Sequence, residues 1–116
     1  MRQFSSHMLG VDQGSVILFS DFENDGPMWA GEGPRELRHE VAFSGRFRRP
    51  PVVHVSMSMW DLDAKTNPRA DIRAAGISGA GFTIVFRTWA DTRIARIRAD
   101  WLALGELDDE DHWDVP

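Results

Sequence analysis

The feature that most constrains the fold is a run of alternating residues between positions 81 and 103. In its first half, Phe82, Ile84 and Phe86 recur at every second position. A period of two is typical of a half-buried antiparallel strand, because successive side chains point to opposite faces. A short polar turn at 90–92 separates this half from a second one. The run therefore predicts two long strands joined by a turn, and the tip of such a turn is a place where β-scaffolds present binding groups.

Similar strand signals occur four more times, and segments rich in Gly, Pro and Asp separate them. There is no long amphipathic helical pattern. Six short strands with turns of this kind predict an all-β sandwich. The further strand candidates are 14–20, 38–43, 52–60 and 69–77, and the expected organisation is an N-terminal leader at 1–13, a β-sandwich at 14–104 and an acidic C-terminal tail at 105–116.

Composition excludes several classes of function. The 116 residues suffice for one domain with a core, and the formal net charge of -5 argues against binding nucleic acid through its phosphates. The absence of cysteine excludes a disulfide scaffold, a thiol nucleophile and a cysteine-ligated metal site.

No apolar run is long enough for a membrane span or a secretory signal, so we expect a soluble protein. No hydrolase, phosphate-loop or dinucleotide motif is present, so we expect neither an enzyme nor a cofactor.

Several short motifs follow one another in an order and spacing known from one lectin family. They are Arg35-Glu36-Leu37, Val41-Ala42-Phe43, Arg49-Pro50-Pro51-Val52-Val53, Asn67-Pro68-Arg69, Gly81-Phe82, Thr88-Trp89-x-x-Thr92 and Trp101. Together they resemble the H-type lectins, the domains of snail agglutinins and of the C-terminal half of discoidins. The resemblance implies a six-stranded antiparallel β-sandwich that forms a homotrimer, sometimes doubled to a hexamer. It also implies that galactose or N-acetylgalactosamine glycans bind in a shallow pocket between protomers, without catalysis.

The resemblance also suggests ligand-binding residues. Arg69 matches the sugar-contacting arginine of the family, and an arginine suits this role because its donors form a fixed, always charged fork. The acidic partner of the family lies in the loop before Arg35. Glu32 is nearest to that place by spacing, and Asp25 is the substitute if the loop differs in length.

The tip of the long hairpin departs from the family pattern. Sugar-binding members commonly carry histidine after the Thr-Trp pair, and Ala90 stands there in this chain. An aromatic residue common near the start of the last strand is replaced by Ala95. We expect Trp89 and Asp91 to lie around the ligand, with Asp91 accepting sugar hydroxyls in place of the histidine. The alternative is a structural trimerisation or assembly domain that has lost sugar binding.

The strand at 52–60 carries a second group of candidate residues. Strict alternation places Met57 and Met59 on one face and His54 and Trp60 on the other, and we expect His54 to be partly buried and hydrogen-bonded. Trp60 precedes two carboxylates, Asp61 and Asp63. This composition suits a sugar site, a hard cation such as calcium, or ordinary loop residues beside a locally packed ring.

Two groups of arginines have two interpretations. They suit either recognition of an anionic glycan or a subunit interface in which arginines pair with acidic residues, and we favour the interface. The groups are Arg87, Arg93, Arg96 and Arg98 on the last hairpin and Arg46, Arg48 and Arg49 before the strand at 52–60, with Asp71, Asp91 and Asp100 as the expected acidic partners.

Overall fold

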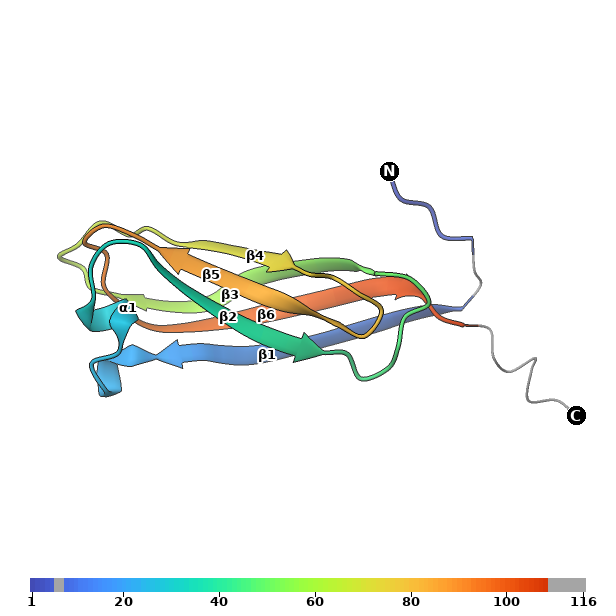
Figure 1. Ribbon diagram of the computed structural model, residues 1–116, viewed down its shortest axis with the longest axis horizontal. Helices are drawn as coiled ribbons and strands as arrows, with labels where there is room; N and C mark the ends of the chain where they lie inside the picture. Colours follow the sequence, from blue (N-terminus) through green and yellow to red (C-terminus); the bar gives the residue numbers. More distant parts are fainter. Residues whose placement is uncertain (6–7, 109–116) are drawn as a thin grey trace, which may run out of the picture.

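Two three-stranded antiparallel sheets pack face to face in the computed structural model, which describes residues 1–5 and 8–108 (Figure 1). One sheet has the strand order β1-β6-β3 and the other β2-β5-β4. The strands of this described part are β1 (Leu9–Ser20), β2 (Arg35–Ala42), β3 (Val52–Leu62), β4 (Asp71–Ala75), β5 (Gly81–Thr88) and β6 (Ile94–Glu106), and a 3-10 turn η1 (Asp21–Glu23) and a short helix α1 (Pro27–Ala30) lie between β1 and β2. The predicted six-stranded antiparallel β-sandwich is confirmed.

The core lies between the inner faces of the central strands β5 and β6. Phe82, Ile84 and Phe86 are at most 4% exposed, as the alternation of the sequence predicts. Opposite them, Ile97 and Ala99 of β6 are fully buried. Burial of one such large side chain contributes about 1.5–3 kcal/mol, so this face drives the association of the two sheets.

A cluster of aromatic rings fills the core near the end that carries both termini. Phe43, Phe82 and Trp101 lie within 5.8 Å of one another, measured between ring centroids. Trp101 also packs over the backbone of Gly14, where an added Cβ would come to 2.6 Å from its ring nitrogen. Gly14 is therefore required so that the β1 backbone can approach the ring.

A β-bulge in β3 changes which side chains face the core. The register on β6 shifts between Met57 and Met59, so that Met59 is opposite Arg98 and Trp60 is opposite Ile97. Cross-strand neighbours share a face, so the prediction that Met59 lies on the face of Met57 was wrong. The prediction for His54 was also wrong, since this residue is exposed on the outer face of its sheet.

The first and last strands extend beyond the expected range of the sandwich. β1 begins at Leu9, before position 14, and β6 continues to Glu106, after position 104. Residues 109–116 of the expected acidic tail lie outside the described residues. Among the described residues, no helix has the length and apolar character needed to cross a membrane.

Candidate functional site

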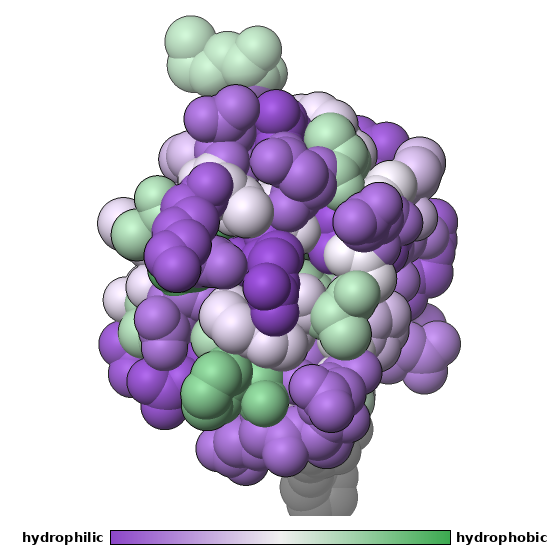
Figure 2. Space-filling view, turned by 90° about the vertical axis from the view of Figure 1, so that its left-hand side faces the viewer, coloured by the Kyte–Doolittle hydropathy of each residue, from purple (hydrophilic) through white to green (hydrophobic). Residues whose placement is uncertain are grey.

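Three loops meet at the end of the sandwich opposite the termini (Figure 1). They are the segment 21–34 between β1 and β2, the segment 63–70 between β3 and β4, and the turn 89–93 between β5 and β6. Hydrophilic residues cover most of this end, and the apolar patches on it are small and separate (Figure 2). The hairpin tip singled out in the sequence therefore belongs to a polar surface built by distant parts of the chain.

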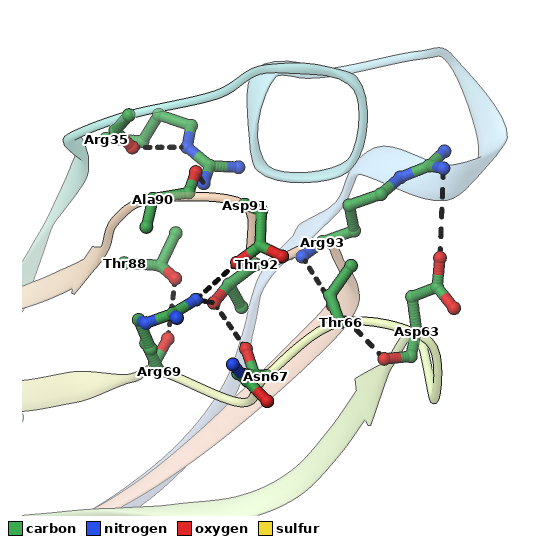
Figure 3. A network of polar contacts seen from close by, with 11 residues as sticks. Arg35, Asp63, Thr66, Asn67, Arg69, Thr88, Ala90, Asp91, Thr92 and Arg93 are labelled. Carbon is green, nitrogen blue, oxygen red and sulfur yellow. Dashed lines mark hydrogen bonds and ion pairs between the residues drawn. The ribbon is translucent and has the colours of Figure 1, made fainter.

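Two buried threonines fix the segment 63–70 to the hairpin (Figure 3). Thr88, 1% exposed, donates its hydroxyl to the carbonyl oxygen of Arg69 at 2.5 Å. Thr92, fully buried, donates to the carbonyl oxygen of Asn67 at 2.6 Å. We call these two residues the threonine pair. It explains in physical terms why the Thr-Trp-x-x-Thr motif and the Asn-x-Arg motif occur together.

Arg69 is held in place by the hairpin tip. Its Nη1 donates to Asp91 Oδ1 at 2.5 Å and to Thr92 Oγ1 at 3.1 Å. The hydrogen bond from Arg69 lowers the pKa of the Asp91 carboxyl below its ordinary value. The Arg69 side chain is one-quarter exposed and that of Asp91 is 62% exposed, so the pair is oriented and still accessible to a ligand.

The tip itself has a constrained backbone at Ala90. This residue has a φ of 59°, in the left-handed region that residues with a Cβ adopt rarely. Its carbonyl oxygen accepts hydrogen bonds from Gly33 N at 2.9 Å and Arg35 Nη2 at 3.1 Å. Burial lowers the pKa of Arg35, and the charge of Glu32 opposes this shift. Arg35 thus links the loop before β2 to the tip.

Arg93, at the end of the turn 89–93, joins the segment 21–34 to the segment 63–70. Its guanidinium lies 4.3 Å from the centre of the Trp29 ring, and its Nε donates to the Trp29 carbonyl oxygen at 3.0 Å. On the other side it forms an ion pair with Asp63 at 3.7 Å. A cation over an indole face is stabilising, so Arg93 holds both the segment 21–34 and the segment 63–70.

The structure brings together only some of the ligand-binding residues predicted from the sequence. Arg69 and Asp91 are in contact, and Trp89, 44% exposed, lines a neighbouring pocket of about 610 Å³ together with Arg35. Glu32 is close enough to Arg35 to affect its pKa. No interaction within the described part of the chain joins the fifth candidate, Asp25, to these residues; it lies in the turn before α1 with a φ of 52°.

Sequence reasoning did not predict which residues support the site, and it placed Arg93 only in a group expected to recognise an anionic glycan or to form a subunit interface. Thr66, Arg35 and Arg93 have this function, and so does the threonine pair. The only signal of the threonine pair in the sequence is its place in a motif, because the acceptors are backbone carbonyls whose position depends on the fold.

The arginines of the last hairpin do not form one cluster. Arg87 pairs with Asp71 on the β2-β5-β4 sheet at 3.0 Å, whereas Arg96 pairs with Asp61 on the other sheet at 3.2 Å. Asp61 and Asp63 are thus both engaged by arginines. Within residues 1–5 and 8–108, no three histidine or acidic side chains are grouped as a metal site would require.

Comparison with known proteins bears on the family and the fold of this chain. The sequence model of the H-type lectin domain matches residues 38–104, more than half of the chain. The chain belongs to the H-type lectin domain family. Its predicted membership is therefore confirmed, and Arg69 and the threonine pair lie within the matched region.

Relatives of this H-type lectin domain occur in Fuscovulum blasticum and in Dictyostelium discoideum. It is 58% identical over 107 residues to the Fuscovulum blasticum protein "ATP synthase subunits region ORF 7", and the match covers 92% of this chain and 93% of that protein. It is 32% identical over 74 residues to a discoidin-1 protein of Dictyostelium discoideum, covering 63% of this chain and 29% of that protein. The structure of discoidin II from the same organism superposes with a TM-score of 0.75 at 20% identity, over 93% of this chain and 40% of that chain.

Proposed function

We propose that this H-type lectin domain binds glycans of the galactose or N-acetylgalactosamine type at the hairpin tip, without catalysing a reaction. Family membership and the lectin-type fold support a carbohydrate ligand. The geometry around Arg69 supports the position of the ligand. Asp91 takes the place of the histidine that family members commonly carry at the position of Ala90.

The orientation of Arg69 is the observation that carries the proposal. Nη1 is occupied by Asp91 and Thr92, and the described structure gives no partner for Nε or Nη2. The backbone of Arg69 is fixed by Thr88, so the guanidinium loses little further freedom when a ligand binds. A pre-oriented fork with unused donors suits the vicinal hydroxyl oxygens of a sugar.

The neighbouring residues complete a binding surface. One carboxylate oxygen of Asp91 is bonded to Arg69, which leaves the other to accept a sugar hydroxyl. Trp89 offers an exposed ring for the apolar face of a pyranose. Glu32 and Asp25 lie in the segment 21–34, from which they contact the ligand of this protomer or of a neighbour in an oligomer.

Glycan binding by three variants tests this proposal. We expect Arg69→Ala to weaken binding at least about tenfold, which corresponds to about 1.4 kcal/mol, on a glycan array and in calorimetry. Arg69→Lys keeps the charge and loses the fork, so an intermediate affinity is expected. Arg73→Ala is the matched control, because Arg73 is an exposed arginine of the neighbouring β4. Equal affinity of Arg69→Ala and wild type would contradict the proposed site.

We further propose that the domain forms a homotrimer through the outer face of the β1-β6-β3 sheet. Five large apolar side chains on this face are between 44% and 65% exposed, which is unfavourable in an isolated protomer. These side chains are Leu9, Val11, Ile17, Val52 and Leu102. Among the described residues, the strands of the other sheet carry no exposed large apolar side chain, and ion pairs between Arg87 and Asp71 and between Arg38 and Glu36 lie on its outer face.

Light scattering after size exclusion tests the assembly. We expect the wild type to elute as a trimer or as a hexamer made of two trimers. Leu102→Lys places a charge at the middle of the apolar face, so we expect this variant to elute as a monomer. Glu40→Lys on the opposite sheet is the control and should leave the mass unchanged. A monomeric wild-type protein would refute the trimer.

The glycan-binding and light-scattering experiments together distinguish the lectin proposal from a second candidate function. This second function is a structural assembly domain that has lost sugar binding. Ala90 at the expected histidine position and the apolar sheet face favour this candidate. A stable trimer that binds no glycan on the array would support it and would refute the lectin proposal.

A further inference from the structure

A second concave surface lies beside Trp60, outside the Arg69 site. Trp60 is 61% exposed, although its position in the β3 register is opposite the buried Ile97. The β-bulge between Met57 and Met59 causes this placement, because it moves Trp60 from the outer face of the sheet to the open edge between the two sheets. The ring is therefore presented to solvent at a place that the alternation of the sequence does not predict.

Trp60 forms a wall shared by two adjoining pockets. One pocket, of about 250 Å³, is apolar and is also lined by Met57 and Ala70. The other, of about 480 Å³, is the more polar of the two and is also lined by Asp61 and Asp63. A site that combines an aromatic ring, an apolar floor and a few polar groups is typical for a small organic ligand.

The polar pocket has balanced charge. The Asp61 carboxylate pairs with Arg96 at 3.2 Å, and the Asp63 carboxylate pairs with Arg93 at 3.7 Å. This balance favours a neutral ligand over a cation or an anion. Asp61 is half-exposed and uses only Oδ2 for Arg96, so its Oδ1 has no partner in the described structure and is ready to accept a hydroxyl hydrogen.

The segment 63–70 that forms the far wall is fixed before any ligand binds (Figure 3). Asp63 N donates to the Arg93 carbonyl oxygen at 2.9 Å, and Asp63 Oδ1 accepts a hydrogen bond from Lys65 N at 2.9 Å. Thr66 Oγ1 donates to the Asp63 carbonyl oxygen at 3.2 Å. A pre-formed wall lowers the entropic cost of binding.

We propose that these two pockets form a second carbohydrate site, which takes one pyranose ring of a neutral glycan. The apolar C–H face of the ring lies on Trp60, and Asp61 Oδ1 accepts a hydroxyl hydrogen. This site goes beyond the proposed Arg69 site and shares no ligand-contacting residue with it. Two sites at one end of the domain would bind a branched or repeating glycan more tightly than either site alone.

NMR titration of the indole N–H signals tests the second site in the full chain. The probes are methyl β-D-galactopyranoside, methyl β-D-glucopyranoside and methyl α-D-mannopyranoside, and the signal of Trp60 is assigned with Trp60→Phe. We expect at least one probe to shift the Trp60 signal with a dissociation constant on the order of 1 mM, and to do so equally in Arg69→Ala. Asp61→Ala should weaken this binding several-fold, whereas Arg73→Ala should not.

The outcomes distinguish the two sites from each other. A Trp60 signal that no probe shifts overturns the second site, whatever happens at Trp89. A shift at Trp60 that remains in Arg69→Ala, together with no effect of any sugar on Trp89, supports the second site and contradicts the proposed Arg69 site. Loss of the oligomer in Trp60→Ala, measured by light scattering, would assign the surface to an interface between protomers and also overturn the inference.

Discussion

Replacing Thr92 by valine tests whether the threonine pair, and not apolar packing, fixes the segment that carries Arg69. Valine has nearly the same shape as threonine, so Thr92→Val leaves the packing of this fully buried side chain in place. It removes the hydroxyl that donates to Asn67 and accepts from Arg69 (Figure 3). Thr92→Ser is the matched control, because it keeps the hydroxyl and loses one methyl group.

The structure allows the size of the effect to be worked out. Thr92→Val loses one hydrogen bond to a backbone carbonyl and one from a charged donor, both partly buried, for a combined loss of about 2 kcal/mol. Thr92→Ser loses about 1 kcal/mol for the missing methyl. For a domain of this size 1 kcal/mol corresponds to about 4 °C, so we expect the Tm of Thr92→Val to fall by about 8 °C and that of Thr92→Ser by about half as much.

Thermal unfolding at a fixed protein concentration measures these differences, because the stability of an oligomer depends on concentration. The double variant Thr88→Val/Thr92→Val adds a further test. Both hydroxyls hold the same short segment, so its loss of stability should be smaller than the sum of the two single losses. If Thr92→Val were as stable as the wild type, or more stable than Thr92→Ser, the hydroxyl would not be what fixes the segment.

Two further predictions follow from the described contacts. Gly81→Ala should destabilise the domain by about 2 kcal/mol in urea unfolding, because the new Cβ would lie 2.2 Å from the Val41 carbonyl oxygen. Gly45→Ala is the control and should be close to neutral, because the space around Gly45 is open. Equal stability of the two variants would refute the steric argument. The pKa of Asp91 is lowered in the folded state, so its contribution to stability is complete above about pH 4 and is lost as the pH falls further through the folded pKa. Asp91→Asn should therefore flatten the fall in Tm below about pH 4, and an acid profile identical to that of the wild type would count against the Arg69–Asp91 pair.

The sequence alone determined the strands and the face that each turns to the core where alternation is regular. That Phe82, Ile84 and Phe86 all point into the core follows from a period of two, and this pattern is local, so no knowledge of other strands is needed. The motif around Arg69 and Asp91 likewise identified two residues that prove to be in contact, although the sequence alone could not place the contact within one chain.

Tertiary structure decided what depends on other segments. The bulge in β3, which reverses the sides of Met59 and Trp60, is a property of the pairing with β6 and leaves no mark in the alternation of β3 itself. The acceptors of the threonine pair lie 19 and 25 residues away along the chain, on a loop without a periodic pattern. Alternation along one strand fixes only which way a side chain points, whereas the partner that it meets is set by how the two sheets and their loops come together.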